Sequence, residues 1–181
     1  MTKIKLANVR CSYPSLFQKA TFEGKETPYY TCTFIIPKDR KSDILKIENA
    51  IENAMKKAGV KKLPKLAKIC FQDGDETDYP ELQGCYSLKA KTKKRPTVIH
   101  NAANGNVSLS YEDGVIYAGC YVNAIISADF YCYTKNSGGI TSTLLGVQFC
   151  RNGESFEGGV AMATEEDFDD FVDFDDEIEE L

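Results

Sequence analysis

VIYAGCYVNAIISADFYCYT, residues 115–134, is the stretch that decides the fold of this 181-residue chain. Its even positions are apolar without exception from Ile116 to Cys132, whereas its odd positions carry tyrosines and polar residues. Successive side chains of a β-strand point to opposite faces, so this alternation predicts one core face and one ring-rich outer face. Because twenty residues exceed a normal strand, we expect a bend, a bulge or two strands with a tight join.

Four other segments have strand character, because they alternate or are rich in β-branched and aromatic residues. They are residues 3–11, which end before Tyr13-Pro14, residues 28–36, residues 83–93, and residues 140–151 after a Gly138-Gly139 turn. In the first segment, Ile4, Leu6 and Asn8 alternate with Lys5, Ala7 and Val9. Residues 101–106 are predicted to form a loop.

Residues 42–58 have a different period. Ile44, Ile47, Ile51 and Ala54 recur at three- and four-residue steps, which predicts an amphipathic helix. Ser42 or Asp39 is expected to cap its start, and Gly59 its end. Five or six strands with one main helix predict a mainly β protein, built as a small, partly open barrel.

Residues 1–164 suit one domain, followed by an acidic tail at residues 165–181. The tail holds eleven carboxylates and no basic residue, which leaves 16 acids against all 22 Lys and Arg in residues 1–164, a net charge of +6 there. Such a dense block of like charge predicts disorder when the tail is free. A plain solvating extension explains the charge, but the rings favour a partner-binding segment. The side chains that suggest this are Phe168, Phe171, Phe174 and Leu181.

A run of basic residues is spaced so that it could follow a nucleic-acid backbone. The run comprises Lys89, Lys91 and Lys93 on one predicted strand face, then Lys94 and Arg95. Alternate residues of a strand lie about 6.6 Å apart, close to the phosphate spacing of an extended single strand. The alternative is an edge strand that its lysines protect against aggregation.

The outer face of residues 115–134 carries rings that could stack on bases. These are Tyr117, Tyr121, Tyr131 and Tyr133. Stacking on aromatic rings tolerates any base sequence, so rings beside a basic strand indicate a nucleic-acid surface, with Arg10 and Arg151 as further phosphate contacts. Alternatively, the rings pack under a loop and expose only their hydroxyl groups.

Little in the sequence indicates an enzyme, a metal or a cofactor. No phosphate-binding P-loop, dinucleotide motif or nucleophile elbow is present. The seven cysteines are scattered without a C-x-x-C pair, as expected for free thiols that act as small core residues. The acidic loop at residues 73–78 fits no calcium motif and is interpreted as a solvated turn. The absence of a long apolar run or a signal peptide predicts a cytoplasmic protein without membrane contact.

Several strings occur together in a suggestive order. They are Tyr13-Pro-Ser-Leu-Phe17, Ile116-Tyr-Ala-Gly-Cys-Tyr-Val-Asn-Ala124, Gly139-Ile140 followed by Leu144-Leu-Gly-Val-Gln148, and Arg151-Asn-Gly-Glu154. With the acidic tail, they make the whole chain resemble a family of bacteriophage single-stranded DNA-binding proteins, distant relatives of the podovirus-type replication protein. The resemblance implies an OB fold, single-strand binding in phage replication and recombination, and a tail that contacts phage or host replication proteins. The chain departs from one such tail pattern, because it ends in Glu180-Leu181 and not in an aromatic residue.

Three hypotheses follow. In the first, lysines neutralise phosphates, tyrosines stack on bases, and the tail competes for the same groove and recruits replication proteins; tail exchange would suit a homodimer. In the second, the chain is an interaction adaptor or DNA mimic whose tail is the active element. In the third, which ranks last, the acidic loop serves a metal-dependent nuclease through Asp75.

Overall fold

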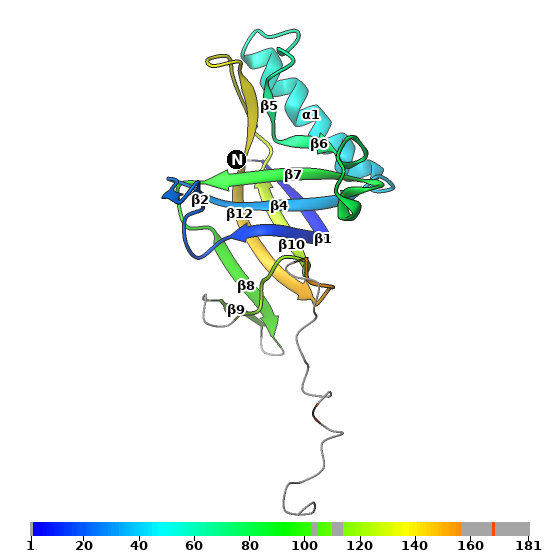
Figure 1. Ribbon diagram of the computed structural model, residues 1–181, viewed down its shortest axis with the longest axis vertical. Coiled ribbons are helices and arrows are strands. Elements are labelled where there is room, and N and C mark those ends of the chain that lie inside the picture. Colours follow the sequence, from blue (N-terminus) through cyan, green and yellow to red (C-terminus); the bar gives the residue numbers. More distant parts are fainter. Residues whose placement is uncertain (1, 103–104, 110–113, 157–167, 169–181) are drawn as a thin grey trace, which may run out of the picture.

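The computed structural model describes residues 2–102, 105–109, 114–156 and 168 (Figure 1). The long elements are β1 (Lys3–Ser15), β4 (Tyr30–Pro37), α1 (Lys41–Lys57), β7 (Cys85–Thr92), β8 (Thr97–Ala102), β10 (Tyr121–Ser127) and β12 (Gly139–Arg151). The short ones are β2 (Thr21–Phe22), β3 (Lys25–Glu26), β5 (Lys68–Ile69), β6 (Phe71–Asp73), β9 (Gly105–Ser108), β11 (Tyr131–Tyr133) and the 3-10 turns Gly74–Glu76 and Pro80–Leu82. Within these ranges, no helix is long and apolar enough to cross a membrane.

Five strands form a closed barrel. β1 pairs antiparallel with β4 and β10, β4 with β7, and β10 with β12. A short parallel pairing of β12 with β7, at Ser142↔Ala90 and Thr143↔Lys91, completes the ring. The prediction of a mainly β barrel with one main helix is therefore confirmed.

The stretch at residues 115–134 supplies much of the core, as its alternation predicts. Cys120, Val122, Ala124 and Ile126 are at most 1% exposed. Full burial of a Val or Ile side chain is worth about 1.5–3 kcal/mol, so Val122 and Ile126 each stabilise the fold by about that amount. The stretch divides into β10 and β11, with residues 115–120 outside any strand, which agrees with the expected interruption.

The first strand departs from its predicted alternation. The register of β1 against β10 shifts between Leu6 and Val9, where Asn8 has a positive φ of 51°. This bulge turns Val9 into the core, although simple alternation placed it on the face opposite Leu6. The guanidinium of Arg40 donates to the carbonyl groups of Ala7, at 2.6 Å, and Asn8, at 3.0 Å, and so satisfies the irregular backbone. β1 also runs past Tyr13-Pro14 to Ser15, beyond its predicted end.

Two local predictions are wrong. Neither Ser42 nor Asp39 caps the helix, because α1 begins after Arg40, which makes no side-chain cap hydrogen bond. The predicted loop at residues 101–106 belongs largely to a hairpin, since Asn101 pairs with Asn106 between β8 and β9. The helix end is as predicted: Gly59 has φ +69°, and the amide of Val60 donates to the carbonyl of Met55.

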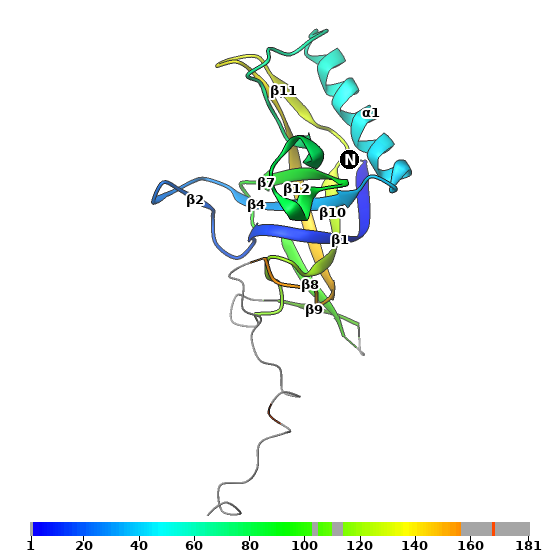
Figure 2. The same cartoon turned by 45° about the vertical axis from the view of Figure 1, so that its right-hand side comes forward.

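Two extensions leave the barrel. β11 and β12 form a hairpin that β5 joins in parallel, and α1 lies beside it in both views (Figures 1 and 2). Between β1 and β4, the β2–β3 arm projects on another side of the barrel. All seven cysteines are free, and four of them are buried, in agreement with the predicted core role.

Candidate nucleic-acid interface

A groove crosses the outer face of β7 and its neighbours; we call it the basic groove. Its cavity is ≈ 370 Å³, and its lining includes Thr33, Lys68, Gln72, Lys89, Lys91 and Tyr133. The two β7 lysines point outward because Leu88 and Ala90, which alternate with them, are fully buried. The outward lysines therefore result directly from strand periodicity, and residues of β4, β5, β6, β11 and β12 complete the lining.

Aromatic rings lie at both ends of the lysine row. Tyr133 lines the groove and stacks on Tyr131, with 6.3 Å between ring centroids and 20° between planes. Tyr131 is 66% exposed, so its ring is available to a ligand. At the other end, Tyr29 lies under the ammonium groups of Lys91, 4.3 Å from the ring centroid, and Lys93, 5.8 Å away.

The cations of the groove have no carboxylate partner. Within the described residues, no Asp or Glu oxygen lies within 4.0 Å of the ammonium group of Lys68, Lys89 or Lys91. The same holds for Lys93, Lys94 and Arg95, and the last two lie exposed in the turn between β7 and β8. Such a row can accept an anionic ligand without first breaking ion pairs.

The other predicted cations form a separate cluster, which we call the arginine clasp. Arg10 donates from Nε to the carbonyl of Gly119, at 3.1 Å, and from Nη2 to that of Glu154, at 2.6 Å. Its guanidinium also lies 4.1 Å from the ring centroid of Phe156. The guanidinium of Arg151 lies 3.7 Å from the ring centroid of Tyr121. These contacts fasten residues 151–156 to the barrel.

Tyr117 belongs to the clasp side and not to the groove. Its hydroxyl donates to the carbonyl of Gly153 at 2.8 Å and accepts from the amide of Gly153 at 3.0 Å. A Cβ at Gly119 would stand 2.1 Å from the carbonyl oxygen of Glu154, so the two chain segments touch through their backbones. For Tyr117, this geometry resembles the alternative in which the ring packs under a loop, except that the hydroxyl is hydrogen-bonded to that loop and is not left to solvent.

The acidic loop is held by a lysine. The ammonium group of Lys38 lies 2.8 Å from a carboxylate oxygen of Asp73 and 2.5 Å from one of Asp75. These contacts hold the pKa of both carboxyl groups below the ordinary value and raise the pKa of Lys38. Among the residues that the structure describes, no three His, Cys, Asp or Glu side chains gather as metal ligands.

The structure thus divides the predicted site residues. Lys89, Lys91 and Tyr133 share one groove, whereas Arg10, Tyr117, Tyr121 and Arg151 surround the clasp. Sequence reasoning missed Lys68 and Tyr29, although Lys68 ends a basic run and Tyr29 precedes a strand. Of the predicted tail residues, Phe168 is exposed, while Phe171, Phe174 and Leu181 lie outside the described residues.

Known proteins share both the sequence and the fold. A family model described as the single-stranded DNA-binding protein of Enterobacter phage Enc34 matches residues 2–179. Protein p50 of Acyrthosiphon pisum secondary endosymbiont phage 1 is 38% identical over 177 residues, which are 93% of each chain.

Solved structures agree with this match. The single-stranded DNA-binding protein from bacteriophage Enc34, in complex with single-stranded DNA, has a TM-score of 0.73 and 29% identity, covering 85% of this chain and 89% of that one. The single-stranded DNA-binding protein gp2.5 of bacteriophage T7 shares the fold, with a TM-score of 0.51 and 15% identity over 90% and 99% of the two chains. The predicted OB-like fold is confirmed, and this chain belongs to the Enc34-type family of phage single-stranded DNA-binding proteins.

Proposed function

We propose that this chain binds single-stranded DNA without sequence preference and acts in phage DNA replication and recombination, in the cytoplasm of the host. The observation that carries the proposal is the basic groove, where Lys68, Lys89 and Lys91 have no carboxylate partner among the described residues and lie beside Tyr133, which stacks on Tyr131. An OB barrel binds oligonucleotides across this kind of strand face and the loops that flank it.

The lysines supply the part of the affinity that does not depend on sequence. Lys89 and Lys91 stand about 6.6 Å apart along β7, so each can meet a different phosphate. Lys68 faces them from β5, and Lys93, Lys94 and Arg95 continue the path beyond the strand. Each phosphate neutralised should release bound counterions, which makes the affinity fall as salt rises.

The rings supply stacking. Tyr131 and Tyr133 offer two nearly parallel planes at one end of the groove, and Tyr29 offers a third at the other end. A base stacked on such a ring is worth about 1–3 kcal/mol. Arg10, Tyr117, Tyr121 and Arg151 hold the clasp, so we propose that they support the folded barrel and do not contact DNA directly.

The acidic tail, residues 165–181, is proposed to regulate the domain of residues 1–164. Its eleven carboxylates would compete with phosphates for the unpaired lysines, and a bound strand would release the tail to recruit phage or host replication proteins. Exchange of tails between two copies would produce a homodimer. The same composition favours the second candidate function, an adaptor or DNA mimic in which the tail alone is active.

Fluorescence anisotropy tests the proposal. A labelled oligo-dT and the matching duplex are titrated with the full chain and with residues 1–164, at low and at moderate salt. We expect tighter binding to the single strand than to the duplex, and tighter binding by the shorter chain. No binding by either protein would overturn the proposal and favour the adaptor, whereas equal affinities of the two would remove only the competing tail.

A further inference from the structure

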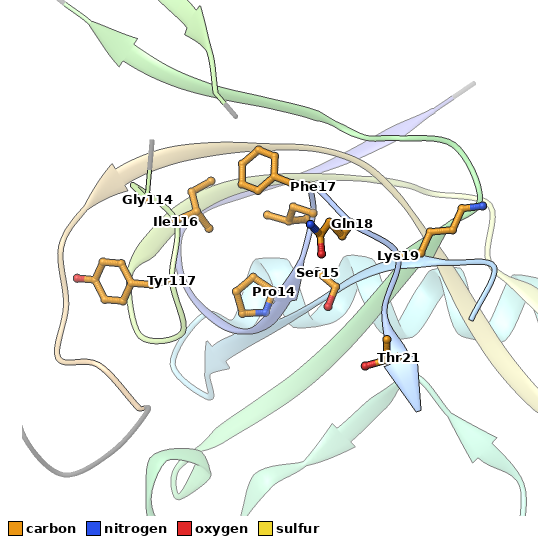
Figure 3. Close-up of a pocket in the computed structure, with 10 residues that line it drawn as sticks. Pro14, Ser15, Phe17, Gln18, Lys19, Thr21, Gly114, Ile116 and Tyr117 are labelled. Atoms are coloured by element: carbon orange, nitrogen blue, oxygen red, sulfur yellow. The ribbon is translucent and has the colours of Figure 1, made fainter. Parts of the chain in front are cut away.

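A second cavity lies at the end of β1, outside the basic groove (Figure 3). Its volume is ≈ 690 Å³. Figure 3 shows Ile116 and Tyr117 on one side, near Phe17 and Pro14, with Lys19 across the opening from Tyr117. The walls are therefore mainly apolar and aromatic, with a cation at the rim, a composition that suits an aromatic side chain flanked by carboxylates.

The clasp holds the end of the continuously described chain, Phe156, beside this cavity. Tyr117, which lines the cavity, also holds Gly153 through its hydroxyl, and the amide of Phe156 donates to the carbonyl of Ala118 at 3.1 Å. The chain therefore leaves the barrel beside the cavity wall. Phe171 stands fifteen positions after Phe156, and an unstructured chain of fifteen residues has a root-mean-square span of about 21 Å.

The cavity also borders the basic groove. Ser15, in its lining, pairs with Thr31, and Thr31 pairs with Lys91. Two strand spacings, about 10 Å, thus separate the cavity from the lysine row. A tail ring seated here would hold its flanking acids within reach of the lysines at an effective concentration far above that of a free peptide.

We propose that this cavity is the docking site of the chain's own tail, with the ring of Phe171 seated between Phe17 and Ile116 and the neighbouring aspartates facing Lys19. Phe171 is the central ring of the three and has two aspartates before it, at positions 169 and 170, and one after it, at 173. The inference rests on the proposed regulatory role of the tail and adds the place on the body where the tail rests.

Photo-crosslinking of the full chain tests the docking. The photoreactive amino acid p-benzoylphenylalanine replaces Phe171, and the crosslinked peptides are identified by mass spectrometry. We expect crosslinks within one chain to residues 14–19 or 114–117. In the variant Lys19→Glu, whose rim charge repels the tail, their yield should fall at least fivefold, while Lys41→Glu on α1, an exposed lysine outside the cavity, should leave it unchanged.

Several outcomes would overturn the docking: crosslinks confined to β4 and β7, crosslinks only between chains in a mixture of ¹⁵N-labelled and unlabelled protein, or the same yield in Lys19→Glu. Oligo-dT binding is measured on the same samples. Binding of oligo-dT without crosslinks to the cavity defeats the docking alone, whereas crosslinks without DNA binding defeat the proposed function alone.

Discussion

The basic groove and the arginine clasp contain the same kinds of side chain, cations and aromatic rings, but these side chains have different partners. In the clasp, Arg10 donates hydrogen bonds to two backbone carbonyl groups, and the guanidinium of Arg151 stacks on the ring of Tyr121. In the groove, Lys68 and Lys89 have no carboxylate within ion-pair distance among the described residues, and Tyr131 is largely exposed. Residue type alone therefore does not separate the two regions, whereas the contacts of the cations do.

This comparison separates two measurable quantities. Changes in the clasp should lower the free energy of unfolding and leave the DNA affinity of the folded protein nearly unchanged. Changes in the groove should do the reverse, because surface lysines without a carboxylate partner in the described residues contribute little to stability.

The largest expected effect is that of Gly119→Ala in the clasp. Its φ of +114° is strained for alanine, and the new Cβ would meet the carbonyl oxygen of Glu154. Strain and overpacking together should cost about 3 kcal/mol of unfolding free energy, measured by urea denaturation. Gly24→Ala is the matched control, since Gly24 also has a positive φ but nothing within 4 Å of the new Cβ. Equal losses in the two variants would show that the backbone contact is unimportant.

The next effect is that of the double variant Lys89→Ala/Lys91→Ala in the groove. Each phosphate contact to a single strand contributes about 0.7 to the salt slope, or roughly tenfold in affinity near 50 mM salt, so the double variant should bind oligo-dT about a hundredfold more weakly. Its salt slope should be smaller by about 1.4. Lys41→Ala/Lys46→Ala on α1 removes the same charge outside the groove. A loss of affinity of the same size in that control would mean that net charge, and not the groove, binds DNA.

The lysine row was predictable because it depends only on local periodicity. Leu88 and Ala90 mark the inward face of β7, and their neighbours must then point outward. The same reasoning gave the core face of residues 115–134. The barrel architecture was also predictable, because short alternating strands with a single helix have few other ways to bury the apolar face of their sheet.

The division into groove and clasp was not predictable, because it depends on contacts between distant segments. Arg10 lies in the clasp because its guanidinium bonds the carbonyl of Glu154, which is 144 residues later in the chain. The four tyrosines look equivalent in the alternating pattern, but the break after β10 sends Tyr131 and Tyr133 to the β11–β12 hairpin and leaves Tyr117 and Tyr121 near the clasp. The bulge at Asn8 likewise reverses the face of Val9 without a clear local signal.

A smaller effect should come from the rings. Tyr133→Ala removes one stacking plane of the groove and should weaken oligo-dT binding about tenfold, within the range for one base on one ring. Tyr133→Phe keeps the plane and should bind as the unchanged protein does. If Tyr133→Phe were as weak as Tyr133→Ala, the hydroxyl and not the ring would contact DNA.

Tyr117→Phe in the clasp, by contrast, loses the hydroxyl contacts with Gly153. It should cost about 1 kcal/mol of unfolding free energy without changing the affinity for oligo-dT.

The smallest effect concerns Lys38, which has two carboxylate partners, whereas the groove lysines have none among the described residues. Its contacts with Asp73 and Asp75 lower the pKa of both carboxyl groups from the ordinary 3.8. A lowered pKa in the folded state stabilises the protein above the ordinary value, and this contribution disappears as pH falls through the lowered one. Lys38→Met should therefore be slightly less stable than the unchanged protein between pH 5 and 8, and the difference should shrink below about pH 3.8. Urea denaturation at stepped pH measures it, with Lys89→Met as the control. Lys89 has no carboxylate partner in the described part of the chain, so its variant should show no acid-dependent difference. A parallel response of the two variants would mean that the two lysines are not distinguished by their partners.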